Sequence, residues 1–122
     1  MGMEFLPDRP IYQQLVEHII GEIIRGALAP GEKLPSVREY ALRTGVNANT
    51  MQRVYKELEQ MGVTETKRGQ GSFVSQDEVK LASVRNNLKE QLVSSFVKKV
   101  ESFGFTAREM AKYLQEREGS YD

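Results

Sequence analysis

The stretch from Lys33 to Val74 most constrains what this chain can fold into, because it carries the start and stop signals of two consecutive helices. Ser36 and Glu39 have the spacing of a capping box, which predicts a first helix over about residues 36–44. Gly45 is the residue type that most easily takes the left-handed conformation that ends a helix. A second helix follows directly, so this stretch predicts a helix, a tight turn and another helix.

The second predicted helix is amphipathic, and Asn47 is suited to cap its start. Its apolar residues recur at helical spacing, and they are Val46, Met51, Val54, Tyr55, Leu58 and Met61. Its opposite side is polar, with Asn49, Thr50, Gln52, Arg53 and Lys56. This plan is typical of a DNA-binding helix-turn-helix, but an ordinary helical hairpin with a solvated polar face would have the same pattern. The two helices alone do not separate these interpretations.

Residues 64–75 predict a β-hairpin with a basic, glycine-rich tip. Its two arms, Thr64 to Lys67 and Ser72 to Ser75, are rich in residues that favour strands. Between them, Arg68-Gly69-Gln70-Gly71 carries two glycines, which permit positive φ and a close approach of the backbone to another molecule. The adjacent lysine and arginine supply charge for phosphates. A helix-turn-helix followed by such a hairpin predicts a winged helix, and the basic wing favours DNA as its partner.

Four motifs in this region resemble the DNA-binding domain of the GntR family of bacterial transcription regulators. They are LPSVRE, GVNANT, QRVYKELEQMGV and RGQGSFV, and the resemblance covers roughly residues 10–74. It implies a winged helix-turn-helix that works as a two-fold dimer. Because the remaining tail is too short for the large effector domains of most branches, the chain is similar to the small YtrA-type branch. That similarity implies dimerisation through the helical tail.

The predicted DNA contacts come partly from chemistry and partly from this resemblance. Asn and Gln side chains bond adenine edges and Arg bonds guanine, so we expect Asn49, Gln52 and Arg53 to face bases. The resemblance implies that Arg38 is a principal DNA contact and that Gly69 enters the minor groove. The full predicted set is Ser36, Arg38, Asn47, Asn49, Thr50, Gln52, Arg53, Lys56, Lys67, Arg68, Gly69 and Gln70.

Two positions depart from the family pattern. Ala48 stands where some branches carry a base-reading arginine, so the readout must come from its neighbours. The family's better-known operator sequences are therefore not assumed for this chain. Tyr40 replaces a more common leucine, which we expect to affect packing only.

An amphipathic helix is also predicted before this region, over residues 10–25, because Pro10 suits a helix start. Its apolar face is Ile11, Leu15, Ile19, Ile20, Ile23 and Ile24. We expect this face to close a core with Val37, Ala41, Leu42, Val54 and Leu58, joined by Leu34 and Phe73. The segment over residues 28–34 predicts a turn.

After a polar join over residues 76–80, the tail predicts two helices separated by Gly104. Thr106 and Glu109 give the second of these helices its own capping box. The apolar residues expected at an interface are Leu81, Val84, Leu88, Leu92, Phe96, Val100, Phe103, Met110 and Leu114. A tail of this length cannot build an independent core, so it packs against the winged helix or against another chain. The resemblance favours a dimer, and a ligand-binding tail lined by its aromatic residues is the alternative.

Composition narrows the function classes. The chain has 122 residues, no cysteine, a single histidine and a formal net charge of zero. It therefore has no disulfide framework or thiol site, and His18 is not expected to bind a metal. No apolar run is long enough to span a membrane and the start lacks the core of a signal peptide, so we expect a cytoplasmic protein. Between Lys33 and Gly71, seven basic residues outnumber four acidic ones, which gives the predicted DNA surface an excess of positive charge.

These patterns predict a mainly α protein with a small β-hairpin wing, in the α+β class. We expect a winged helix-turn-helix DNA-binding domain over residues 5–75 and a helical dimerisation tail over 76–122. The predicted function is a homodimeric repressor that binds a two-fold DNA operator, with no cofactor, no membrane partner and no catalytic constellation. The alternatives are a winged-helix protein-interaction module and a regulator whose tail also binds a small-molecule effector.

Overall fold

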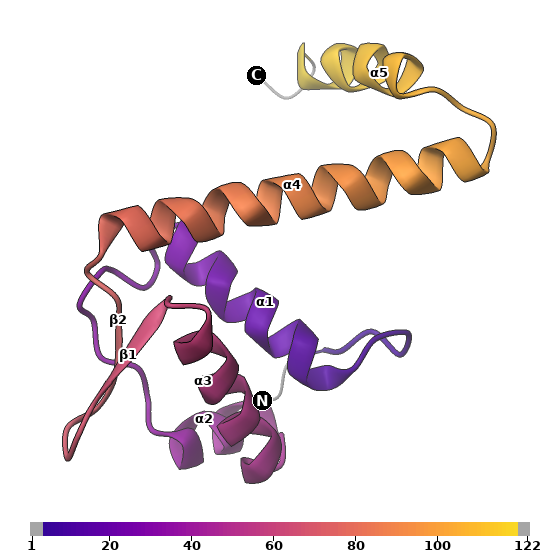
Figure 1. Cartoon of the computed structure of the whole chain (residues 1–122). Coiled ribbons are helices and arrows are strands. Elements are labelled where there is room, and N and C mark those ends of the chain that lie inside the picture. Colours follow the sequence, from indigo (N-terminus) through magenta and orange to yellow (C-terminus); the bar gives the residue numbers. More distant parts are fainter. Residues whose placement is uncertain (1–3, 120–122) are drawn as a thin grey trace. The chain divides into compact units, whose positions relative to one another are not determined.

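The computed structural model describes residues 4–119, with the side chains of residues 4–117. Within this range the elements are α1 (Ile11–Ile24), α2 (Val37–Thr44), α3 (Ala48–Gln60), β1 (Thr64–Lys67), β2 (Gly71–Val74), α4 (Glu78–Ser102) and α5 (Ala107–Gly119) (Figure 1). The chain divides into two compact units inside α4: the winged-helix unit, Met1–Val84, and the tail unit, Arg85–Asp122. The prediction of a mainly α chain with one small hairpin is confirmed.

Local capping sets the helix-turn-helix as the sequence predicts. The Ser36 hydroxyl accepts a hydrogen bond from the Glu39 N–H, and the Glu39 carboxylate accepts one from the Ser36 N–H, which completes the capping box. Gly45 ends α2 in the left-handed conformation with φ of 71°. The Asn47 side-chain oxygen then accepts from the Asn49 N–H at 2.7 Å and starts α3. Each helix boundary is thus fixed by a side chain or glycine next to it.

The core of the winged-helix unit lies where α1 and α2 pack against α3, and where α3 meets β1. Its most deeply buried apolar side chains are Leu15, Ile19, Leu34, Met51, Val54, Leu58, Val63 and Val74. Tyr40 is buried as well and meets Tyr55 edge to face, with ring centroids 6.3 Å apart. Edge-to-face geometry is a favoured aromatic contact, so Tyr40 serves packing, in agreement with the sequence.

The predicted core was wrong at Leu42, which is 78% exposed. The short helix α2 buries Tyr40, Ala41 and Thr44, and a residue at position 42 points away from that stripe. Ile11 and Met61, also expected on apolar faces, lie at helix ends and are partly exposed. Phe73 is only half-buried. Its ring lies in the wing, and the Lys67 ammonium lies over it.

The hairpin is antiparallel, with Thr64 opposite Val74 and Lys67 opposite Gly71. Its second strand therefore begins and ends one residue earlier than predicted. The segment over residues 31–34, predicted as a turn, runs along the free edge of β2: the Leu34 N–H donates to the Ser72 carbonyl, and the Val74 N–H donates to the Glu32 carbonyl, both at 2.8 Å. Backbone pairing on both edges of β2 holds the wing to the body of the unit.

Helix α4 begins at Glu78, three residues before the predicted start. The Asp77 carboxylate explains the difference, because it accepts hydrogen bonds from the Val79 and Lys80 N–H groups at 3.1 Å and acts as an N-cap. Thr106 and Glu109 form the predicted capping box at the start of α5. Among the described helices, none is both long and apolar enough to cross a membrane.

Candidate nucleic-acid interface

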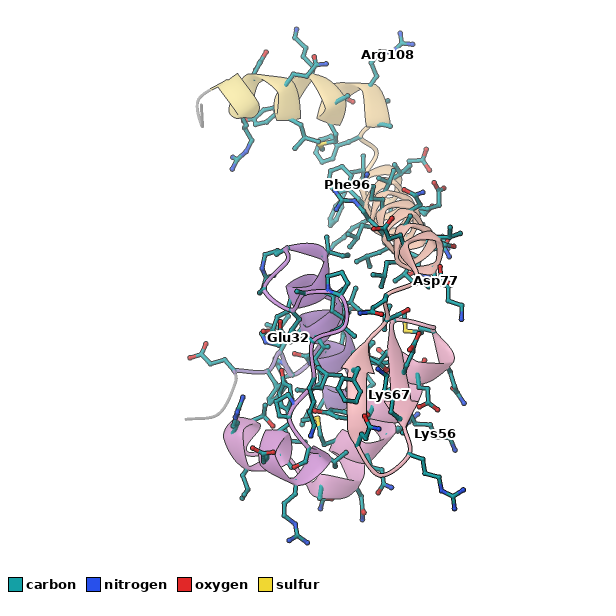
Figure 2. All side chains as sticks on the ribbon, turned by 90° about the vertical axis from the view of Figure 1, so that its left-hand side faces the viewer. Glu32, Lys56, Lys67, Asp77, Phe96 and Arg108 are labelled. Carbon is teal, nitrogen blue, oxygen red and sulfur yellow. The ribbon has the colours of Figure 1, made fainter. Side chains whose placement is uncertain are left out.

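The outer face of α3 carries the polar residues that the sequence predicts for base contacts. Met51, Val54, Tyr55 and Leu58 are buried, so the opposite side of the helix faces solvent. Asn49, Gln52, Arg53 and Lys56 are exposed on that side, and Thr50 is half-buried at its edge. Figure 2 labels Lys56 on this helix. The structure therefore brings the predicted polar set together at the surface of one helix.

The N-terminus of α2 presents a second polar site. The capping box uses the N–H groups of Ser36 and Glu39. The N–H groups of Val37 and Arg38 have no intrahelical acceptor, because they lie in the first turn. Together with the helix dipole and the exposed Arg38 guanidinium, they form an arrangement suited to an anion such as a phosphate.

A hydrogen bond fixes this site relative to α3. The Tyr55 hydroxyl donates to the Pro35 carbonyl at 2.5 Å, directly before the Ser36 cap. Burial raises the pKa of Tyr55 and raises the pKa of Tyr40 to about 12, so both hydroxyls keep their protons above pH 10, where an exposed tyrosine loses its own. The Tyr40 hydroxyl donates to Glu22 on α1 at 3.3 Å. The Tyr55 bond thus ties the start of α2 to α3, and the Tyr40 bond ties α2 to α1.

Arg53 lies differently from its neighbours. Its guanidinium carbon is 3.6 Å from the centroid of the Tyr12 ring on α1, which is a stacked cation–π contact. Tyr12 was not among the predicted site residues. Its position directly beside the apolar face of the first helix could have indicated a contact with a neighbouring helix. Arg53 is therefore held at the α1 side of the outer face, while Gln52 faces away from that helix.

The wing tip is open and basic. Arg68, Gly69 and Gln70 are exposed, and Gly69 has φ of 77° with no other atom within 4 Å of where a Cβ would lie. The ammonium of Lys67, a residue of β1 that Figure 2 labels, lies 4.6 Å from the Phe73 ring centroid. The positive φ at position 69 would strain any other residue. Because glycine has no side chain, the tip backbone can approach another molecule closely.

A hydrogen bond connects the wing to α3. The Thr66 hydroxyl on β1 donates to the Glu59 carboxylate on α3. Lys33, which the predicted set did not include, adds a cation beside the wing. Its Cε would lie 3.1 Å from a Cβ placed on Gly71. The wing and α3 thus form one framework with basic side chains on both.

The residues predicted for dimerisation separate into two groups. Leu81, Val84, Leu88 and Met110 are half-buried, and Val100 is 5% exposed. Leu92, Phe96, Phe103 and Leu114 are exposed, Leu92 to 62%, and Figure 2 labels Phe96 on α4. Val93 is a further exposed apolar residue of the same helix, and the predicted stripe did not contain it.

The single histidine lies outside this interface. His18 Nε2 is 3.3 Å from a Glu22 carboxylate oxygen, one turn along α1. No group of three or more potential metal ligands occurs among the described residues.

Comparison with known proteins agrees with this architecture. The family described as "Bacterial regulatory proteins, gntR family" matches residues 11–74. The uncharacterized HTH-type transcriptional regulator YhcF of Bacillus subtilis (strain 168) is 41% identical over 115 residues, covering 94% of this chain and 95% of the relative. The HTH-type transcriptional repressor YtrA of the same organism is 37% identical over 98 residues, covering 75% of each chain.

Solved structures share the fold. A GntR family transcriptional regulator from Listeria monocytogenes has a TM-score of 0.84 at 33% identity, over 92% of this chain and 98% of that chain. AraR(DBD) in complex with operator ORX1 has a TM-score of 0.56 at 26% identity, over 62% of this chain and 95% of that chain. The chain belongs to the GntR family of bacterial regulatory proteins, with the YtrA-like transcriptional regulators among its relatives.

Proposed function

We propose that this regulator is a repressor that binds a two-fold DNA operator as a homodimer. The observation that carries the proposal is the amide-rich N-terminal half of α3, whose Asn49 and Gln52 side chains are exposed opposite the core. Amide side chains on the exposed end of a recognition helix can bond base edges in the major groove. The likeness to AraR(DBD), a protein solved on its operator, supports the same mode of docking.

In the proposed complex, α3 enters the major groove with its N-terminus first. Asn49 and Gln52 read base edges, and Arg53 contacts the DNA from its position on the Tyr12 ring. Arg38 and the first turn of α2 bind phosphate, for which helix N-termini are suited. The wing tip enters the minor groove at Gly69, where the backbone is open to close approach.

The tail supplies the second half of the proposal. A surface with several exposed apolar side chains is typical of a site that another protein covers. Leu92, Phe96 and Phe103 of the tail are all exposed. The aromatic residues lie on the surface of the tail unit, which favours a packing partner over an enclosed ligand site. Two tails packed together would place two winged helices on two half-sites, so that operator symmetry matches protein symmetry.

This function needs no catalysis, because a repressor acts by occupying its site. We propose that the protein works in the cytoplasm, where bacterial DNA is. A winged-helix module that binds another protein would be expected to show exposed aromatic residues on α3, whereas the exposed side chains there are Ala48 and amide, basic and acidic residues.

The test is binding of the full chain to its own upstream promoter DNA, with a random duplex of equal length as control, over a range of salt concentrations. We expect selective binding of the promoter, two chains per site and an affinity that falls as salt rises. Arg38→Ala should weaken promoter binding, and Arg108→Ala, an exposed arginine on α5, is the matched control. Equal binding to both duplexes, or an Arg38→Ala variant that binds as tightly as the wild type, would contradict the proposal.

A further inference from the structure

A hollow lies where α2, the turn and α3 meet. It has a volume of about 290 Å³, and its lining is Arg38, Ala41, Leu42, Gly45, Val46 and Ala48. Apart from the arginine, every lining residue is apolar or glycine. The hollow begins at the first residue of the recognition helix, so it belongs to the surface proposed to face DNA.

Two exposed side chains form the apolar part of this hollow. Leu42 is 78% exposed on the outer side of α2, one helical turn after Arg38. Ala48 is exposed as the first residue of α3, and its methyl group cannot hydrogen-bond to a base. The residues on either side of Ala48, Asn47 and Asn49, are polar. The recognition surface thus contains one apolar site between hydrogen-bonding side chains.

We propose that this hollow reads thymine, with the 5-methyl group of the base packed against Ala48 and Leu42. The thymine methyl is the apolar group that base pairs present in the major groove, and it matches a lining whose side chains, apart from Arg38, form no hydrogen bonds. The Arg38 guanidinium on the rim attracts a phosphate, which favours DNA over an apolar protein segment as the occupant. This inference rests on the proposed operator binding and specifies which base the departure at Ala48 selects.

The expected effect is that of removing one buried methyl group. Burying a methyl-sized group strengthens binding by about fourfold, so each thymine in the hollow should contribute about that factor. The volume leaves room for more than one methyl group, and adjacent thymines would then each contribute.

The experiment first selects the best-bound duplexes from a random library with the full-length protein. Each thymine of the selected site is then replaced singly by deoxyuridine, which lacks only the 5-methyl group, and dissociation constants are measured by fluorescence anisotropy. We expect one or two positions to lose about fourfold in affinity in the wild type. In the Leu42→Gln variant the same replacements should have a clearly smaller effect, because the methyl group then keeps only its contact with Ala48.

Controls separate this inference from the proposed function. Leu6→Gln replaces another exposed leucine and should retain the full deoxyuridine effect, and thermal unfolding establishes that both variants are folded. Selective binding without any loss at deoxyuridine would overturn the thymine inference alone, as would a loss that is as large in Leu42→Gln as in the wild type. Failure of the library to yield any preferred sequence would overturn the proposed operator binding and this inference with it.

Discussion

The two units of this chain use apolar side chains in opposite ways. The winged-helix unit buries leucine, isoleucine, valine and methionine residues from α1 and α3, together with residues of the hairpin and the segment beside it. In the tail unit, Val100 is the one described side chain that is buried, while Leu92, Val93, Phe96, Phe103, Phe105, Tyr113 and Leu114 are exposed. The first unit therefore has an apolar core of its own, whereas most large apolar side chains of the second lie at its surface.

This contrast is the basis of the dimer that we propose. A winged helix presents one reading helix, and two such units on one site need a fixed spacing. A tail that is apolar on its outside can supply that spacing by joining two chains. The stability of the reading unit and the assembly of two chains then depend on different residues.

The largest expected effect separates the two units by stability. Leu58 is fully buried in the winged-helix unit, so Leu58→Ala should lower the free energy of unfolding by about 2–5 kcal/mol at any protein concentration. Leu92 is exposed in the single chain, so the effect of Leu92→Ala should depend on protein concentration, as expected for a residue buried between chains. Urea unfolding at several concentrations checks this. A concentration-independent loss for Leu92→Ala would place that side chain in an intramolecular core.

The next effect concerns assembly. Leu92→Asp places a charge where another chain is proposed to pack, and it should convert the dimer to a monomer and abolish tight operator binding. Val79→Asp is the matched control, because Val79 is an exposed apolar residue of the same helix that lies off the predicted stripe. Sedimentation velocity distinguishes the two forms. A Leu92→Asp protein that still sediments as a dimer would refute the assignment of the tail.

A smaller effect tests the contact between α1 and the recognition helix. Loss of a base contact through Arg53→Ala should cost about 1–3 kcal/mol of operator binding. Tyr12→Leu should cost less, about 0.5–1 kcal/mol, because it removes only the ring on which the guanidinium stacks. Tyr12→Phe retains a ring and should bind nearly as the wild type does. In a double-mutant cycle, Tyr12→Leu should have no effect once Arg53 is alanine, and additive losses would show that the stacking does not serve DNA binding.

The smallest effect concerns alkaline pH and again belongs to the winged-helix unit. Burial raises the pKa of Tyr40 from 10.0 to about 12, so between these values the unfolded chain loses a proton that the folded chain keeps. The contribution of Tyr40 to the free energy of unfolding should therefore be constant below pH 10 and fall as the pH rises toward 12. Tyr40→Phe should reduce this fall, with Tyr113→Phe in the tail unit as the matched control. Thermal unfolding across this range would contradict the account if Tyr40→Phe leaves the fall unchanged.

Much of this fold follows from short-range signals. The capping boxes at Ser36 and Thr106 and the left-handed glycine at position 45 depend on residues within a few positions of one another, and the structure has them as predicted. The start of α4 also has a local signal, the capping carboxylate of Asp77, which the predicted boundary did not include. Boundaries fixed by a neighbouring side chain can thus be predicted when every capping residue is weighed.

The differences arise where residues distant in sequence meet. The contact between Tyr12 and Arg53 joins α1 to α3, and the segment over residues 31–34 pairs with β2 about 40 positions later. No periodic pattern of residues in the sequence indicates either of these two contacts. The prediction that Leu42 is buried was wrong for another reason. In a helix as short as α2, a single apolar residue does not show which side of the helix faces the core. The polar residues of the candidate interface were predictable as a set because they share one helix face.

The measurement that tests the central claim most directly is a hydroxyl-radical footprint of the full chain on its selected operator. Two copies joined through their tails should protect two symmetric half-sites whose centres lie about one helical turn of DNA, or a multiple of it, apart. The Leu92→Asp variant should lose both protected regions together at the same protein concentration. A single protected site, or a Leu92→Asp variant that protects both half-sites as the wild type does, would contradict the account of a reading unit paired by its tail.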